Sequence, residues 1–133
     1  MRARTKFTRA MQMLFTRPGL EQASSELTAR HRARRYTNAR HVADLCAGIG
    51  GDLIALAQGR AALAVDVDPV RLRMAGHNAD VYEAGGAVTT VHADVRDADL
   101  AGIDGVFVDP ARRCGSEGCI PVGASRHWTG AWT

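Results

Sequence analysis

The chain has 133 residues, of which 46% are hydrophobic, and this size and composition fit one small globular domain. No apolar run approaches the roughly 18 residues that a membrane span requires, and the basic N-terminus is not followed by the apolar core of a signal peptide, so we expect a cytoplasmic protein. Three cysteines, an odd number, favour reduced thiols over a disulfide framework. Cys114 and Cys119, even with His127, match no zinc-ligand spacing, and we expect no metal site.

Charge is divided unevenly along the chain. The formal net charge is +3, but residues 1–40 contain ten arginines and lysines and two acids, whereas residues 41–133 contain seven arginines and twelve acids. A basic segment that precedes an acidic one indicates a polyanion partner, most simply nucleic acid. The alternative is a solvated helix surface that happens to be rich in arginine.

The first forty residues are predicted to form two helices, separated by Pro18-Gly19. The first covers residues 5–15, where apolar side chains recur at helical spacing. The second covers residues 20–36, with a weakly apolar inner face on which His31 is expected to be packed or half-exposed rather than catalytic, and a basic end that suits the helix dipole. The apolar positions are Phe7, Met11, Leu14 and Phe15 in the first helix and Leu20, Ser24, Leu27 and His31 in the second, whose basic end holds Arg30, Arg32, Arg34 and Arg35.

From residue 41 onwards, short apolar strands alternate with helices. Helices are predicted over residues 52–58 and from Pro69 to about Ala84, and Asp68 precedes the second as its N-cap. Strands are predicted over residues 41–46, 61–66, 87–92 and 105–109. This alternation predicts an α/β protein with a Rossmann-like, doubly wound, mostly parallel sheet of about four strands, preceded by the two helices.

Three regions follow from these patterns. Residues 1–40 form a basic helical N-terminal region, and residues 41–113 form an incomplete Rossmann-like domain. Residues 114–133 have no strand or helix periodicity and are expected to be an unpatterned tail, although a complete sheet of this kind needs about three more strands.

Candidate site residues follow the predicted strands. Ligands of an open α/β sheet bind beyond the carboxyl ends of its strands, where this chain places Asp44, Asp66, Asp94 and Asp109. The loop after the first strand contains Gly48, Gly50 and Gly51, which allow a ligand to approach the backbone closely. Leu53 stands where a dinucleotide fingerprint requires a further glycine, and no Walker lysine is present.

The charge of these residues indicates the charge of the ligand. Asp44 and Asp52 flank the position of a pyrophosphate, and like charges so close are destabilising. S-adenosylmethionine, which carries a sulfonium and an ammonium group, suits the loop better. Asp66 lies 18 residues after Gly48, a spacing typical of an acid that accepts hydrogen bonds from a ribose diol, and Asp94 is placed to accept from an adenine amino group. The alternatives are a helix-dipole role for Asp52 and a turn role for Asp94.

The stretch from Asp44 to Pro110 resembles Rossmann-like S-adenosylmethionine-dependent methyltransferases, and most of all the trimethylguanosine synthase-like group of RNA methyltransferases. The segments that carry this resemblance are residues 44–51, 66–69 and 78–82. Other segments are similar to bacterial methyltransferases with a THUMP-like C-terminal region, namely residues 17–23, 31–33 and 109–113.

The resemblance implies an S-adenosyl-L-methionine-dependent methyltransferase that acts on RNA, with the basic N-terminal region as the RNA contact. Asp44 and its loop would hold the methionine moiety, Asp66 the ribose and Asp94 the adenine. Asp109 and Pro110 occupy the place of the family's substrate-facing tetrapeptide, and we expect them to be catalytic. The expected cofactor-binding residues are Asp44, Cys46, Gly48, Gly50, Gly51, Asp66, Val67 and Asp94.

This sequence departs from the family pattern after Pro110. Ala111 replaces a proline and Arg112 replaces an aromatic residue that stacks on the base, so Arg112 and Arg113 are suited instead to meet phosphate.

Two alternatives remain open. Resembling proteins continue recognisably after Arg113, so this chain is expected to be truncated there, and a truncated remnant would at most bind the cofactor. A nucleotide-dependent oxidoreductase shares the architecture, although the glycine pattern and the acids of the loop disfavour it.

Overall fold

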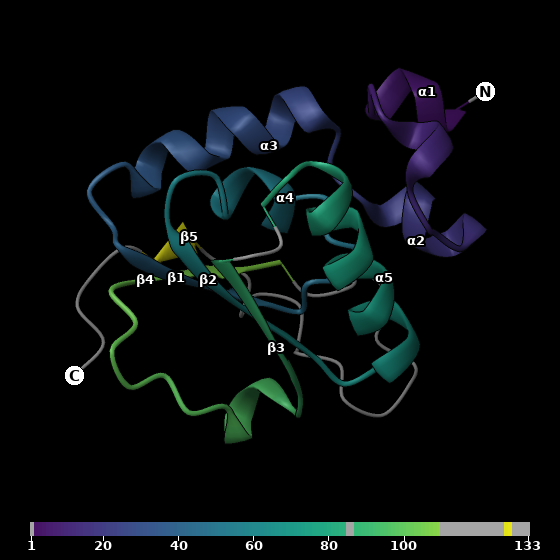
Figure 1. Ribbon diagram of the computed structural model, residues 1–133. Helices are drawn as coiled ribbons and strands as arrows, with labels where there is room; N and C mark the ends of the chain where they lie inside the picture. Colours follow the sequence, from purple (N-terminus) through teal and green to yellow (C-terminus); the bar gives the residue numbers. More distant parts are fainter. Residues whose placement is uncertain (1, 85–86, 110–126, 129–133) are drawn as a thin grey trace.

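A five-stranded sheet lies at the centre of the protein in the order β3-β2-β1-β4-β5 (Figure 1). The computed structural model describes residues 2–84, 87–109 and 127–128. Four strands are parallel and β5 is antiparallel to β4. Their bounds are β1 (His41–Leu45), β2 (Ala61–Asp66), β3 (Val88–His92), β4 (Gly105–Val108) and β5 (His127–Trp128). The predicted parallel α/β sheet is confirmed. Strand β5 lies within residues 114–133, where the sequence has no strand periodicity.

The order of the strands reverses at β1. The chain moves outward from β1 through β2 to β3 and then returns to the other side of β1 as β4. Asp44 of β1 is consequently in register with Ala64 of β2 on one side and Phe107 of β4 on the other. Such a reversal is where open α/β sheets bind ligands, beyond the carboxyl ends of the strands.

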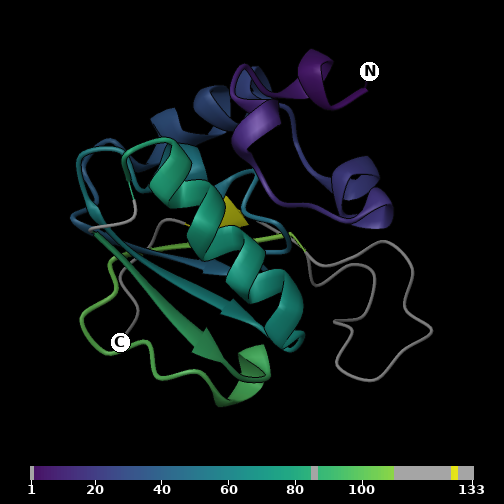
Figure 2. The same cartoon turned by 45° about the vertical axis from the view of Figure 1, so that its right-hand side comes forward.

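Helices α3, α4 and α5 cover one face of the sheet, and Figure 2 shows α5 lying across the strands. Their bounds are α3 (Glu26–Ala33), α4 (Leu53–Leu56) and α5 (Pro69–Val81). Small side chains at the contact, among them Ala62, Ala64, Ala75 and Ala79, are almost fully buried and let α5 approach closely. The opposite face packs against the segment after β3, through Leu100 and Ile103 and near the 3-10 helix η4 (Val95–Asp97).

The N-terminal region differs from the prediction in its first helix. Helix α1 (Arg2–Lys6) ends before Phe7, and only a 3-10 turn, η1 (Ala10–Gln12), follows it. Met11 and Leu14, predicted to lie on an apolar face, are 72% and 50% exposed. The cause is tertiary, because the buried Asn78 side chain of α5 donates to the Leu14 carbonyl and accepts from its N–H, both at 2.8 Å. These bonds hold the backbone of residue 14 outside any helix.

The predicted second helix is two helices. Pro18 does not break a helix but lies in the first turn of α2 (Arg17–Gln22), where proline is well suited, and Thr16 is its N-cap. The chain then breaks and restarts at α3, capped by the Ser25 hydroxyl, and 3-10 helix η2 (Arg34–Tyr36) continues it.

Because α3 is a separate helix that begins after Ser25, the side chains that it buries differ from those predicted. Ala29 and Ala33 pack inward, while Leu27 is 76% exposed and His31 is exposed, so the predicted apolar face with a packed His31 is wrong. Alanine one turn apart allows α3 to lie close to α4, which a leucine at this contact would prevent.

Elements after residue 41 agree more closely with the sequence. The Asp68 carboxylate accepts from the N–H groups of Val70 and Arg71, which confirms its role as the N-cap of α5. The helices are shorter than predicted, since α4 ends at Leu56 and α5 at Val81. Among the helices that the structure describes, none is long and apolar enough to cross a membrane.

Candidate functional site

Four carboxylates meet where β1, β2 and β4 end. Asp44 and Asp66 are almost fully buried, at 2% and 4% exposure, and Asp52 lies at the start of α4 beside them. Asp109 directly follows β4, and its side chain is 47% exposed. We call Asp44, Asp52, Asp66 and Asp109 the acid cluster. The sheet thus brings together three of the four predicted strand-end acids, together with Asp52.

Asp44 is the centre of this cluster. Burial raises the pKa of its carboxyl well above the usual value, and the nearby carboxylates of Asp52, Asp109 and Asp66 raise it further. Its Oδ2 atom is buried and has no hydrogen-bond partner in the part of the chain that the structure describes, and the same holds for Oδ1 of Asp52. A buried acceptor without a donor is destabilising by about 1–3 kcal/mol. The arrangement therefore suits a ligand that brings a positively charged donor.

The glycine loop beside Asp44 has several residues with positive φ angles. Cys46 and Gly48 both have positive φ, +69° and +58°, and the Gly48 N–H donates to Oδ2 of Asp66 at 2.9 Å. Gly50 has φ +92°, and a Cβ atom there would lie 3.0 Å from Cα of Ala75 in α5. No atom of the described residues lies within 4 Å of the corresponding position at Gly48, so these residues leave that side of the loop open to a ligand.

Asp66 joins the loop to β2. Its two oxygens accept from the N–H groups of Gly48 and Asp68, each at 2.9 Å, and Nη2 of Arg71 lies 3.8 Å from Oδ1. Each carboxylate oxygen has a second lone pair, so these bonds orient Asp66 and still leave it able to accept from a ribose hydroxyl. Its role toward a ligand stays a prediction.

Asp94 lies after β3, apart from the acid cluster. Its carboxylate accepts from Nε and Nη2 of Arg96 at 3.0 and 2.7 Å and from the Arg96 N–H at 2.9 Å. The side-chain bonds from Arg96, followed by the backbone bond, lower the pKa of Asp94 to about 2. The structure therefore contains the turn role that the sequence left open, and the adenine role stays a prediction.

Cys46 and Val67 contribute to the shape of the site. Burial raises the pKa of the Cys46 thiol to about 12, with further contributions from the carboxylates of Asp66 and Asp44. A raised pKa favours the protonated thiol at neutral pH, which is the less nucleophilic form. The Val67 carbonyl lies 2.9 Å from Nε2 of His92, which ties the end of β2 to β3.

Sequence reasoning missed the role of Arg32 of α3. Its Nη1 atom lies 2.6 Å from the Ser24 hydroxyl, 3.4 Å from Oδ2 of Asp52 and 3.9 Å from Oδ2 of Asp109. Its guanidinium also stacks over the Phe107 ring at 5.9 Å. The charge pattern places Arg32 only at the basic end of a helix. Its position within residues 31–33, which carry part of the family resemblance, is the one signal that could have indicated a role at the site.

Asn78 is a second position whose role the sequence did not reveal. Its fully buried amide donates to the carbonyl of Ile49 in the glycine loop and bonds the backbone of Leu14. It therefore joins the N-terminal region to the loop through α5.

The remaining predicted residues lie outside the described part of the chain. They are Pro110, Arg112, Arg113, Cys114 and Cys119. Within the described residues, no group of three or more histidine, cysteine or acidic side chains is arranged to hold a metal ion.

The sheet order, the glycine loop and the strand-end acids define a Rossmann-like methyltransferase fold. Residues 39–120 match the family model described as RNA cap guanine-N2 methyltransferase, and the chain belongs to this family. An uncharacterized S-adenosylmethionine-dependent methyltransferase of Mycobacterium tuberculosis is 42% identical over 110 residues, which are 77% of this chain and 28% of the relative. The chain thus spans 28% of the length of the curated relatives that it matches.

Solved structures share the fold. An RNA methyltransferase from Salinibacter ruber in complex with S-adenosyl-L-homocysteine has a TM-score of 0.55 at 21% identity, with 61% of this chain and 56% of that chain covered. The N-terminal domain of EvdMO1 with S-adenosylhomocysteine bound has a TM-score of 0.52 at 30% identity, with 59% and 37% covered. The predictions of the fold, of a methyltransferase family and of S-adenosylmethionine as its cofactor are confirmed.

Proposed function

We propose that this chain is the cofactor-binding part of an S-adenosyl-L-methionine-dependent methyltransferase that acts on RNA. The observation that carries the cofactor half of the proposal is the buried Oδ2 atom of Asp44, which has no hydrogen-bond partner among the described residues and lies beside a glycine loop that these residues leave open at Gly48. An ammonium group would satisfy this oxygen and favour the ionised carboxylate. A phosphate would instead add negative charge to a cluster of carboxylates.

Each residue of the site binds a different part of the cofactor. Asp44 takes the ammonium, and Arg32, which pairs with Asp52, is suited to the methionine carboxylate. Asp66, oriented by the N–H groups of Gly48 and Asp68, accepts from the ribose. Cys46 and Val67 line the same edge, and Asp94 at the end of β3 accepts from the adenine.

Methyl transfer requires mainly binding and orientation from the protein. Bound S-adenosylmethionine supplies an electrophilic methyl group on a positively charged sulfur. The chain contributes orientation and charge placement, which are the main sources of rate in an in-line displacement. Asp109, the half-exposed member of the cluster, faces the substrate together with Pro110 and accepts a hydrogen bond from the group that is methylated.

RNA as the substrate is supported by the family model and by the basic N-terminal region, and the shared motifs favour the trimethylguanosine synthase-like and THUMP-like branch. We also propose that residues 1–40, 41–113 and 114–133 are separate functional regions. The odd number of cysteines supports a cytoplasmic location.

Calorimetric titration with S-adenosylhomocysteine tests the cofactor half of the proposal. We expect binding by the native chain and a loss of about a hundredfold in affinity for Asp44→Asn, because the amide lacks the charge that pairs with the ammonium. The matched control is Asp80→Asn, which changes an exposed carboxylate on α5 and is expected to bind as the native chain does. No binding by the native chain, or equal binding by Asp44→Asn, would contradict the proposal.

Transfer of a radiolabelled methyl group to total RNA tests the catalytic half. We expect transfer that is lost in Asp66→Ala. Cofactor binding without transfer to any RNA would leave a cofactor-binding remnant as the function of this chain, which is the second candidate.

A further inference from the structure

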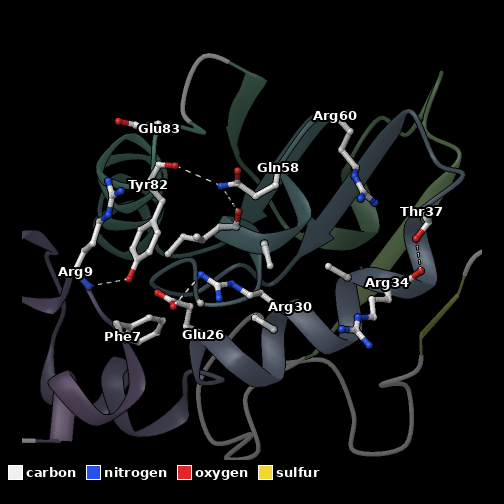
Figure 3. Close-up of a pocket in the computed structure, with 15 residues that line it drawn as sticks. Phe7, Arg9, Glu26, Arg30, Arg34, Thr37, Gln58, Arg60, Tyr82 and Glu83 are labelled. Carbon is white, nitrogen blue, oxygen red and sulfur yellow. Dashed lines mark hydrogen bonds and ion pairs between the residues drawn. The ribbon is translucent and has the colours of Figure 1, made fainter.

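A pocket of about 560 Å³ lies beside α3 (Figure 3). It is bounded by α3, α4, the end of α5 and the N-terminal region, and it includes residues from the loops that lead into β2 and β3. Four of its lining residues are arginines and two are glutamates. We call it the arginine pocket, after Arg9, Arg30, Arg34 and Arg60.

Helical geometry directs Arg30 and Arg34 of this pocket away from the acid cluster, although Gly51 of the glycine loop also lines the pocket. Arg30 and Arg34 are four residues apart, so they project from the same side of the helix. Arg32 is two residues from each, and about 100° per residue turns it to the opposite side, where it meets Asp52. One basic segment therefore serves two different sites.

The arginines of the pocket retain capacity to bind an anion. Arg30 pairs with Glu26 at 3.0 Å through one nitrogen, and its side chain is still 63% exposed. Arg9 uses one nitrogen for the carbonyl of Val81, and Arg60 uses one for the carbonyl of Tyr36. A guanidinium has five N–H donors, so these contacts fix the side chains and leave donors for a ligand.

The separation of the four arginines along the pocket indicates which kind of anion the pocket binds. In Figure 3, Arg9 lies at one end of the pocket beside Tyr82, whereas Arg34 and Arg60 lie toward the other end. The Glu26 carboxylate is occupied by Arg30 and by the Thr8 hydroxyl, at 2.9 Å, which reduces its repulsion of an anion. A row of separated guanidinium groups suits successive phosphates better than one small anion.

We propose that the arginine pocket binds the phosphate backbone of RNA. This inference rests on RNA being the substrate under the proposed function, and it adds where the strand is held. Because Arg30 and Arg34 project away from the acid cluster, the nucleotides held here are not the nucleotide that is methylated. A strand that spans both sites is required for tight binding.

Fluorescence anisotropy with a labelled single-stranded RNA of about 20 nucleotides tests the pocket. We expect Arg30→Gln/Arg34→Gln to weaken binding about tenfold relative to the native chain. The slope of log K against log salt should fall by about 0.7 for each phosphate that the variant no longer neutralises. The matched control, Arg35→Gln/Arg73→Gln, removes the same charge from exposed arginines outside the pocket and should weaken binding much less.

Glu26→Gln gives a change of opposite sign, because it removes a negative charge from the pocket and keeps all four arginines. We expect tighter RNA binding in this variant. Equal losses in the two double variants, or weaker binding in Glu26→Gln, would overturn the inference.

Further measurements separate this inference from the proposed function. If the native chain binds S-adenosylhomocysteine but no RNA, the pocket inference and the RNA substrate are both wrong, and the cofactor half stands. If RNA binds through the pocket and S-adenosylhomocysteine does not bind, the proposed function is wrong and the pocket stands. Inorganic phosphate that binds the native chain but not Arg30→Gln/Arg34→Gln, without RNA binding, would identify a small-anion site and overturn the inference.

Discussion

The acid cluster and the arginine pocket have opposite charge. In the cluster four carboxylates outnumber two arginines, Arg32 beside Asp52 and Asp109 and Arg71 beside Asp66. In the pocket four arginines outnumber two glutamates. The cluster is largely buried, so its charges act at low dielectric and two of its oxygens have no partner among the described residues. The arginines of the pocket reach solvent, where salt screens them.

The difference in burial and charge between the two sites indicates how each selects its ligand. A buried, incompletely satisfied carboxylate selects one charged group at one position and is insensitive to salt. A row of exposed guanidinium groups binds through the number of charges, and its affinity depends strongly on salt. Changes in the cluster are therefore expected to have larger effects than changes at exposed charges.

The largest effect is expected for the pH dependence of stability. The raised pKa of Asp44 means that the folded state binds its proton more tightly than the unfolded chain. Its stabilising contribution is therefore present below the ordinary aspartate pKa of about 3.9 and is lost as the pH rises through the raised folded value.

Urea unfolding of the native chain and of Asp44→Asn at a series of pH values measures this contribution. At neutral pH we expect Asp44→Asn to raise the free energy of unfolding by about 1–3 kcal/mol, because the charge that burial disfavours is removed. The advantage should disappear at acidic pH. An unchanged difference between the two proteins across the pH range would show that Asp44 is not protonated preferentially in the folded state.

The glycine loop that shapes the cluster is expected to be nearly as sensitive. Gly50→Ala combines φ +92° with a Cβ that would lie 3.0 Å from the Ala75 backbone, so we expect a loss of about 2–3 kcal/mol in the free energy of unfolding. Gly59→Ala is the control, since Gly59 has φ +74° but nothing within 4 Å, and a loss of about 1 kcal/mol is expected. Equal losses in thermal or urea unfolding would show that the contact with α5 contributes nothing.

Arg32 tests whether the two sites act independently. Arg32→Gln should weaken S-adenosylhomocysteine binding about tenfold, because the guanidinium that pairs with the methionine carboxylate is removed. It should also lower the free energy of unfolding by about 1–2 kcal/mol, because Asp52 loses an ion-pair partner. RNA affinity should change less than in Arg30→Gln/Arg34→Gln, and the opposite ranking in anisotropy would show that Arg32 belongs to the RNA site.

The smallest effect is expected for Asp94→Asn. Its carboxylate is partly exposed and is bonded to the exposed side chain of Arg96, so unfolding should be almost unchanged. If Asp94 accepts from the adenine, affinity for S-adenosylhomocysteine falls about threefold to tenfold, which corresponds to the removal of one hydrogen bond. Unchanged affinity in calorimetry would leave Asp94 with the turn role alone.

Local patterns were sufficient where one segment forms one element. The apolar run that became β2 and the Asp68-Pro69 pair that begins α5 each carry the physical reason for their structure within a few residues. The strand-end acids were also predictable, because parallel strands place their carboxyl ends at one edge. The sequence by itself therefore determined the parallel sheet, its glycine loop and the cofactor class that the acids favour.

Only the tertiary structure decided the N-terminal region and the pairing of its side chains. Leu14 leaves a helical pattern because Asn78, 64 residues away, bonds its backbone. Arg32 reaches Asp52 and the neighbouring Arg30 faces the arginine pocket because the chain restarts after Ser25 and turns Ala29 and Ala33 inward. Contacts between residues far apart set that rotation, and helical periodicity within residues 20–36 contains no information about them.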